Sequence, residues 1–265
     1  MASCGGGGDG GGGGGGGGDG SASFAPGTQT FSHCLANGST NTIDTFGGFA
    51  VSSNIWNPGS STYTQCTSAS IQPSGGVASA EFDWNFASSN TNVKTYPNIQ
   101  FGRENTYRAS TTPLLPAPVT ALPSLNVTGN VATTCNVGPC WYDSAFDIFF
   151  SSSANSWSKI PQAELMIMLQ YNLSGDGKPG NIVGSFTYGG ITYNVQYFMM
   201  NGEWPYVAYY PTTQISNINI NVGSFVQDAV RRGYIQSSYY LDMVEIGTEV
   251  ERGQGVTTIS NYNIQ

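Results

Sequence analysis

The sequence contains very few charged side chains and a single histidine. Charged residues make up 9% of its 265 residues, and the formal net charge is −8. Lysine and arginine form no cluster of the kind that phosphate binding needs, so we expect no nucleic-acid partner. His33 stands alone, which excludes a histidine-rich zinc site and leaves a Ser-His-Asp triad only if it recruits His33. We therefore expect no metal and no cofactor, and any hydrolytic chemistry must rest on carboxylates or tyrosines.

Long apolar runs are also absent, and the N-terminus is nearly pure glycine. No apolar stretch reaches the roughly 18 residues of a membrane span. Residues 1–20 hold 14 of the 36 glycines, so they predict a flexible tether, followed by one folded domain over residues 21–265. The start Ala2-Ser3-Cys4 before this spacer resembles a processed bacterial lipoprotein, which would anchor the chain through Cys4. The alternative is a free thiol in a flexible tail.

The other four cysteines predict disulfides. None of them forms a C-x-x-C pair, which argues against a zinc ribbon or a thioredoxin-type site. Three pairings are possible, and we favour Cys34–Cys66 and Cys135–Cys140, because a tight loop through Gly138 and Pro139 permits the second bond. Disulfides indicate an oxidising compartment. Together with the scarcely charged, hydroxyl-rich and aromatic surface, they predict a secreted protein that meets neutral polymers.

Short runs of β-branched and aromatic residues, separated by Gly, Pro, Asn and Ser, predict an all-β sandwich or barrel. One segment is helical in pattern: Phe225–Arg232 repeats apolar residues at i, i+4 and stops at Gly233. No internal repeat or second linker is present, and nothing suggests an obligate oligomer, so we expect a monomer. The clearest expected strands are Val77–Phe86, Asn92–Phe101, Trp141–Phe150, Ala163–Tyr171, Ile191–Met200 and Tyr239–Gly247.

Alternation along the expected strands places acids opposite aliphatic side chains. Glu164 shares a face with Met166 and Met168, while the residues between them are leucine and isoleucine. Glu245 and Glu249 likewise share a face, opposite valine and isoleucine. Because buried glutamate is rare unless it is paired or functional, these acids are candidates for catalysis.

Two further segments repeat this arrangement. Asp147 shares a face with Phe149, opposite Phe146 and Ile148, and Asn54 alternates with Trp56. Acids, amides and aromatic rings on one side of several strands predict a curved sheet with a concave sugar-binding face.

Several motifs in this order resemble glycoside hydrolase family 12. Asn54-Ile55-Trp56 is similar to an N-x-W segment of the family, and Phe146-Asp147-Ile148-Phe149 to its Y-D-x-F motif. Asp147 and Glu164 are 17 residues apart, which is the spacing expected in that family. The remaining similar motifs are Thr64-Gln65-Cys66-Thr67 beside an N-terminal disulfide, Val93-Lys94-Thr95-Tyr96-Pro97-Asn98, Glu164-Leu165-Met166-Ile167 and Gly247-Thr248-Glu249.

The resemblance implies a β-jelly roll, a sandwich of two curved antiparallel sheets with a concave substrate cleft. It implies a retaining endo-β-1,4-glucanase that acts on cellulose or β-glucan, or a xyloglucan-specific hydrolase. Glu164 would be the nucleophile, Glu249 the general acid/base, and Asp147 the carboxyl partner of the nucleophile. Asn54 and Trp56 would line the donor side of the cleft. Met168 departs from the family, which usually has tryptophan there, and this change could alter substrate preference.

Several alternatives stay open at this point. Glu245 and Glu251 compete with Glu249 for the acid/base role, and Asp143 competes with Asp147. The other expected substrate contacts have structural alternatives: Trp56 as a core aromatic, Met166 and Met168 as core residues, and Trp204, Tyr206 and Tyr210 as ordinary strand packing rather than sugar platforms. A non-catalytic lectin or carbohydrate-binding module on the same scaffold is the second functional class. Such a protein needs the aromatic residues but not two cleft carboxylates.

Overall fold

The structure, a computed structural model, describes residues 26–87, 91–103, 109–155, 160–173 and 181–265. Within these residues strands dominate, and one α-helix is present. Strands and helices have the following bounds: β1 Gln29–Ala36, β2 Ile43–Phe46, β3 Phe49–Ser52, β4 Thr62–Ile71, β5 Val77–Ala87, β6 Asn98–Gly102, β7 Ala117–Pro118, the 3₁₀ turn η1 Val119–Ala121, β8 Asn126–Ser151, β9 Ala163–Asn172, β10 Ile182–Tyr188, β11 Ile191–Met200, β12 Trp204–Pro211, β13 Asn217–Asn221, α1 Val222–Arg231 and β14 Tyr240–Ile264.

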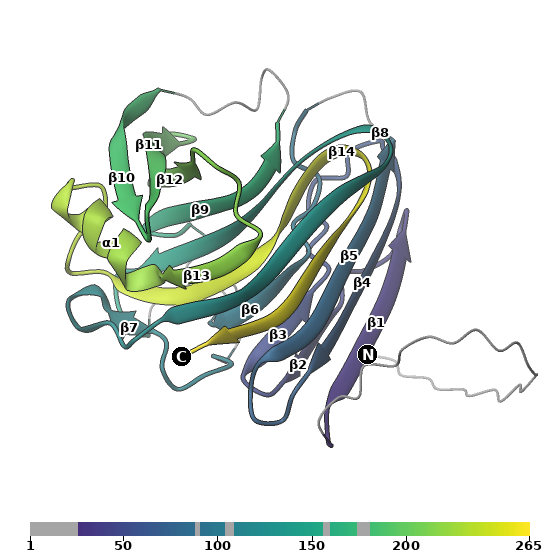
Figure 1. The fold of residues 1–265 in the computed structure, drawn as a ribbon, viewed down its shortest axis with the longest axis horizontal. Helices are drawn as coiled ribbons and strands as arrows, with labels where there is room; N and C mark the ends of the chain where they lie inside the picture. Colours follow the sequence, from purple (N-terminus) through teal and green to yellow (C-terminus); the bar gives the residue numbers. More distant parts are fainter. Residues whose placement is uncertain (1–25, 88–90, 104–108, 156–159, 174–180) are drawn as a thin grey trace, which may run out of the picture.

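Two very long strands organise the fold. β8 has 26 residues and β14 has 25, and they pair antiparallel along most of their length, crossing the whole molecule in Figure 1. The main path of the sheet runs β1-β4-β5-β14-β8-β9-β12-β11-β10. Register shifts near Val250 and Gln254 bend this pair, so the sheet curves back over itself. The expected jelly roll is confirmed, with one local difference: β12 pairs parallel to β9.

The core lies between the two halves of this curved sheet. Phe146, Ile148 and Phe150 of β8 are fully buried, as are the leucine and isoleucine side chains of β9 that alternate with Glu164 and Met166. The two halves meet through aromatic contacts, such as Phe146 against Tyr262. We call the opposite side of β8, β9, β12 and β14 the cleft face. Alternation along the strands therefore separates the core from this face, as expected from the sequence.

Helix α1 covers the core side of β10, β11 and β12. Asn221 caps its first turn by accepting a hydrogen bond from the Ser224 backbone, and Phe225 packs edge-on against Tyr193 and Tyr209. Asp228 accepts a hydrogen bond from the Tyr209 hydroxyl at 3.0 Å. The predicted helix is confirmed, and its attachment fixes the strands that carry one wall of the cleft.

A closed ring of four hydroxyl groups ties the bend of the two long strands together. Ser144 and Thr248 bond to each other across the strand pair at 2.9 Å, and Thr133 and Thr257 do the same at 2.9 Å. Bonds of 2.8 Å join Ser144 to Thr133 and Thr248 to Thr257. Because these hydroxyls satisfy one another, polar groups are tolerated at buried positions next to the acids of the cleft face.

Both favoured disulfides are present. Cys34–Cys66 joins β1 to β4, and Cys135–Cys140 closes the tight loop within β8. The predicted tether and Cys4 lie outside the described residues. Among the described residues, no helix combines the length and apolar character needed to cross a membrane.

Candidate active site

A cavity of about 420 Å³ opens on the cleft face. It gathers acids from β8, β9 and β14 with aromatic side chains from neighbouring segments. Its lining residues are Asn54, Trp56, Tyr96, Asp147, Phe149, Pro161, Glu164, Met200, Asn201, Trp204, Met243, Glu245 and Glu249.

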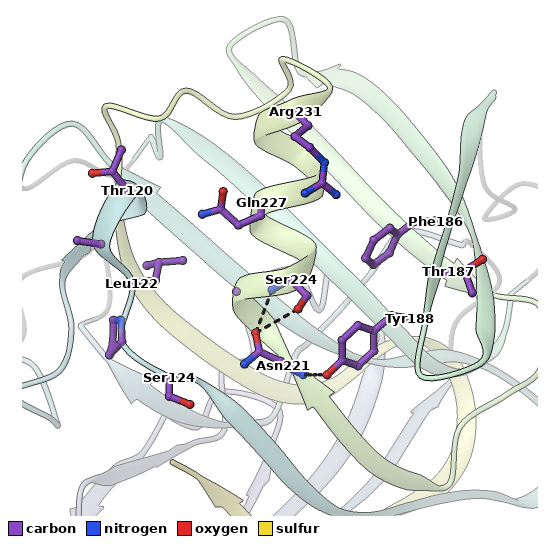
Figure 2. A pocket seen from close by; sticks show the side chains of 13 residues that line it. Thr120, Leu122, Ser124, Phe186, Thr187, Tyr188, Asn221, Ser224, Gln227 and Arg231 are labelled. Carbon is purple, nitrogen blue, oxygen red and sulfur yellow. Dashed lines mark hydrogen bonds between the residues drawn. The ribbon is translucent and has the colours of Figure 1, made fainter.

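A larger cavity of about 760 Å³ lies beside α1. Figure 2 shows that Gln227 and Ser224 of the helix lie between Leu122 on one side and Tyr188 on the other. No carboxylate, histidine or cysteine is among its lining residues, so this cavity lacks the paired carboxyl groups of the smaller one. The acid-lined cavity is therefore the candidate active site.

Glu164 lies on β9, and its side chain is held by a tryptophan from the adjacent strand. The Trp204 indole Nε1 donates a hydrogen bond to Glu164 Oε2 at 2.8 Å. Only 8% of Glu164 is exposed, and this burial raises its pKa to about 7, although the bond from Trp204 lowers the pKa and the charge of Glu249 raises it. The carboxylate is thus fixed in orientation and poised to change protonation near neutrality.

Glu249 lies on β14, directly opposite Asp143 of β8. The two carboxyl groups share a hydrogen bond, which lowers the pKa of Glu249, but burial outweighs it and raises that pKa to about 7. Burial, followed by the charge of Glu249, raises the pKa of Asp143 well above its usual value. This pair can therefore keep a proton at pH values where an exposed carboxyl would lose it.

Asp147 of β8 and Glu245 of β14 lie on the cleft face, between Glu164 and the pair formed by Asp143 and Glu249. Asp147 is opposite Glu245 on one side and Met166 on the other, which places it diagonally next to Glu164. Burial and then the charge of Glu164 raise the pKa of Asp147 well above its usual value. A protonated Asp147 is a hydrogen-bond donor beside the ionised Glu164.

The strand register places Glu164 and Glu249 far apart along β8, yet their side chains line one cavity. Glu164 is opposite Phe149, whereas Glu249 is opposite Asp143, six residues earlier in the same strand. The curvature of the sheet accounts for this convergence, because side chains on the inside of a bend approach one another.

Gly247 allows a neighbouring segment to cross close to these acids. A Cβ atom at Gly247 would lie 2.4 Å from the Pro97 carbonyl oxygen and 2.7 Å from Asn98 Cβ. That segment carries Tyr96, whose buried hydroxyl donates to the Ala145 carbonyl at 3.0 Å, below the cavity. Glycine is therefore required two residues before Glu249 for packing, independently of chemistry.

Comparisons with known proteins identify the family. The model of glycosyl hydrolase family 12 matches residues 47–265. The chain belongs to this family. It is 26% identical to a xyloglucan-specific endo-β-1,4-glucanase A of Emericella nidulans over 83% of this chain and 86% of that protein. It is also 26% identical to an inactive glycoside hydrolase of Phytophthora nicotianae, over 82% of this chain and 86% of that protein.

A crystal structure of a metagenome-derived family 12 endoglucanase is similar throughout. It is 27% identical, has a TM-score of 0.71, and covers 89% of this chain and 97% of that chain. Each motif from Asn54 to Glu249 that suggested the resemblance lies inside the matched range.

In this family 12 chain, Asn54 and Trp56 both reach the cavity, but not from a regular strand. Asn54 has a φ of 38°, and its carbonyl accepts a hydrogen bond from the Tyr96 backbone at 3.0 Å. Trp56 is 56% exposed, which excludes the alternative of a core aromatic. An exposed ring at the rim of the cavity is available for stacking.

Met166, Met168 and Tyr206 lie on the cleft face but not in the cavity lining, contrary to the expectation that they contact substrate. Their exposed fractions are 2%, 1% and 6%, and they pack in one cluster with Tyr210. The Tyr206 hydroxyl donates to the Met166 sulfur at 3.0 Å. The physical reason is that this part of the cleft face is filled by its own side chains. These residues therefore pack beside Glu164 on the same face of the sheet.

The structure also shows where the competing acids lie. Asp143 and Asp147 point to the same face of β8. The strand register places Asp143 directly opposite Glu249 and Asp147 diagonally next to Glu164. Glu245 lines the cavity, whereas Glu251 does not. His33 pairs with Asp44 at 2.7 Å and is not among the lining residues of the cavity.

Sequence reasoning missed the cavity-lining roles of Tyr96, Phe149 and Asn201. Tyr96 carried a signal, since it stands within the Val93–Asn98 motif, and Phe149 shares the parity of Asp147. Asn201 carried none, because it comes from a turn whose position depends on β11 and β12. Among the described residues, no group of three histidines, cysteines or acids is arranged to hold a metal ion.

Proposed function

We propose that this protein is a retaining endo-β-1,4-glucanase, with Glu164 as nucleophile, Glu249 as general acid/base and Asp147 as the partner of the nucleophile. The observation that carries the proposal is the convergence of Glu164 and Glu249 in one cavity, each with a pKa near 7. Family membership supports the reaction class, and the open cavity on the cleft face suits an internal segment of a polymer.

In the first step, an oxygen of ionised Glu164 attacks the anomeric carbon, and the glycosidic C–O bond breaks. Glu249 gives its proton to the departing sugar oxygen, so no alkoxide has to leave. Burial and the charge of Glu164 raise the pKa of Asp147, and its buried Oδ1 has no hydrogen-bond partner in the structure. Asp147 therefore has a proton and a free oxygen with which to donate a hydrogen bond to the nucleophile as the reaction proceeds.

In the second step, Glu249 takes a proton from water while the water oxygen attacks the same anomeric carbon. The ester bond to Glu164 breaks, and Glu164 returns as a carboxylate. The Asp143–Glu249 pair suits this exchange, because a proton shared between two carboxyl groups can be given and recovered near neutral pH.

The substrate class follows from the cavity and from the relatives. No lysine or arginine is among its lining residues, so it is suited to neutral rather than acidic sugars. Relatives include an enzyme named as xyloglucan-specific and a family 12 endoglucanase, so β-1,4-glucan polysaccharide is the proposed substrate, with unbranched glucan and xyloglucan as the two forms to compare. The two disulfides support secretion, and lipid attachment at Cys4 remains a prediction.

A non-catalytic sugar-binding protein is the alternative. It is worth testing because one relative is named as an inactive glycoside hydrolase. Glu164, Glu249 and Asp147 distinguish the two, because binding sugar does not require three buried carboxyl groups with raised pKa values. Such groups cost folding free energy, which is expected where catalysis uses them.

The test compares wild type with Glu164→Gln and Glu249→Gln in reducing-sugar release from carboxymethyl-cellulose, barley β-glucan and xyloglucan. We expect wild-type activity on at least one polymer and a loss of several orders of magnitude in both variants. A wild type that binds glucan without cleaving it would instead support the sugar-binding alternative. Proton NMR of the first product distinguishes retention from inversion at the anomeric carbon.

A further inference from the structure

Trp204 begins β12 and meets Glu164 across the parallel strand pair. Tyr206 is the direct partner of Glu164, and Trp204 stands two residues earlier on the same face. Its indole lines the cavity and donates from Nε1 to Glu164 Oε2 at 2.8 Å. We propose that Trp204 is a positioning residue that holds one oxygen of the nucleophile and leaves the other free to attack, an inference that rests on the proposed function of Glu164.

The indole N–H is suited to this task because it donates and never accepts. It stabilises the ionised carboxylate more than the protonated form, whose carbonyl oxygen is a weaker acceptor. Burial raises the pKa of Glu164, and the bond from Trp204 is the largest effect in the opposite direction. Without this donor, more of the enzyme would hold a protonated, unreactive Glu164 at mildly acidic pH.

The cavity offers no positively charged side chain that could replace Trp204 as a hydrogen-bond donor to Glu164. The titratable groups that face Glu164 from the neighbouring elements are all acids or phenols, and no lysine or arginine is among the lining residues of the cavity. A neutral donor stabilises the negative charge without adding a cation that would attract the carboxylate away from the sugar. Asp147 of β8, Glu249 of β14 and Tyr206 of β12 interact electrostatically with Glu164, and Tyr96 and Glu245 line the same cavity.

The backbone keeps the indole in place. A turn precedes Trp204, in which the Glu203 backbone donates to the Met200 carbonyl at 2.8 Å, and Asn201 and Gly202 have φ values of 51° and 75°. Trp204 is also paired with Met200 across β11 and β12. A ring mounted on a closed turn and a paired strand loses little conformational entropy when it binds the carboxylate.

The experiment measures kcat/KM against pH for Trp204→Phe with two substrates, a β-glucan polymer and an aryl β-cellobioside with a dinitrophenolate leaving group. We expect the acidic limb of the profile to move to higher pH and kcat/KM at pH 5 to fall by about 10- to 100-fold, as for the loss of a hydrogen bond to a charged group. The loss should persist with the aryl substrate, because a better leaving group replaces the acid but not the nucleophile.

Two variants serve as matched controls. Trp56→Phe also changes a tryptophan of the cavity but removes no donor from Glu164, so it should affect KM and leave the acidic limb in place. Glu249→Gln should lose far less activity on the aryl substrate than on the polymer. If Trp204→Phe does not fold, replacing Trp204 by benzothienylalanine removes the N–H and keeps the shape of the ring.

The outcomes separate the two proposals. A wild type that cleaves neither substrate removes the proposed function, and this inference with it. A wild type that is active, with an acidic limb unmoved in the Trp204 variants, overturns the positioning role alone. Equal losses at all pH values would also overturn it, because they would indicate a packing effect.

Discussion

Asp242 and the acids of the cavity are all buried, but they have different partners. Asp242 is fully buried and pairs with Arg103 at 2.8 Å, with Ser151 donating to the same oxygen at 2.9 Å. The acids of the cavity have each other, a tryptophan and several tyrosines as neighbours, and no lysine or arginine among the lining residues. The first arrangement stabilises a charge, whereas the second makes ionisation costly.

The pKa values express this difference. Burial raises the pKa of Asp242 to about 6, and Ser151 and Arg103 limit the rise. In the cavity, the charges of neighbouring acids add to burial, so the pKa values of Glu164 and Glu249 reach about 7, and those of Asp143 and Asp147 are raised well above their usual value. Carboxyl groups without cations are expected where protons must be exchanged near neutral pH.

The largest expected change in the free energy of unfolding comes from breaking the ion pair between Arg103 and Asp242. Arg103→Met should lower the free energy of unfolding by about 3–5 kcal/mol at pH 7, because it leaves the Asp242 carboxylate buried without its cation. A raised folded pKa means that stability falls as pH rises through that pKa, so the loss should shrink toward pH 4, where Asp242 is protonated. Urea denaturation at both pH values measures it. Arg103→Met/Asp242→Leu is the control and should recover most of the loss.

Removing a charge from the cavity should change the free energy of unfolding in the opposite direction. Asp147→Asn should raise the free energy of unfolding at pH 7 by roughly 1–3 kcal/mol, because the raised pKa of Asp147 costs stability once the unfolded state is ionised. The gain should diminish toward pH 4, and activity should decline because Glu164 loses its proton-bearing partner. Thermal melts and glucan hydrolysis on the same samples test both. A destabilised Asp147→Asn would show that this acid is favourably paired after all.

The pH profile of the wild type tests whether the cavity acids work as a proton-exchanging set. In the proposed mechanism the first step needs Glu249 protonated, and burial raises the pKa of this group to about 7. We therefore expect a bell-shaped profile with an optimum at or below neutrality and a decline of about tenfold per pH unit on the alkaline side. Initial rates on β-glucan between pH 4 and 9 measure this. An optimum above neutrality contradicts the assignment of Glu249 as the acid.

The smallest expected effect concerns Asp143. Asp143→Asn should move the alkaline limb slightly to higher pH, because the hydrogen bond with Asp143 lowers the pKa of Glu249 and an amide N–H is a weaker donor than a carboxyl O–H. The rate at the optimum should change by about fivefold, the size of one hydrogen bond of ~1 kcal/mol. The same assay measures it, with Asp44→Asn, at the His33 pair, as a control that should leave the profile unchanged.

Much of this architecture could be predicted from local sequence patterns. Alternation identified the strands around Asp147 and Glu164, and the repeat at i, i+4 identified the helix ending near Arg231. Both disulfides followed from the cysteine spacing and the resemblance. Strand lengths were harder: the Gly138-Pro139 pair correctly indicated a loop, since residues 138–140 have no partner in β14, but pairing with β14 resumes at Trp141, so β8 is longer than the local pattern suggested.

The acid-rich cavity was only partly predictable. Parity placed Asp143 and Asp147 on one face but could not assign either to a partner, because register depends on the pairing of distant strands. Parity also placed Met166 and Tyr206 on the cleft face, where neighbouring side chains cover them. The hydrogen bond from Trp204 to Glu164 joins residues 40 positions apart, and no local pattern encodes it.

The sequence by itself determined which side chains are apolar, which are acidic and how they alternate, so it determined the strands, the helix and the two faces of the sheet. The tertiary structure alone decided which acids lie opposite one another, which tryptophan bonds to Glu164 and which aromatic rings remain exposed. The reason is that alternation is a property of a single strand, whereas register, curvature and burial arise only when strands far apart in the sequence pack together.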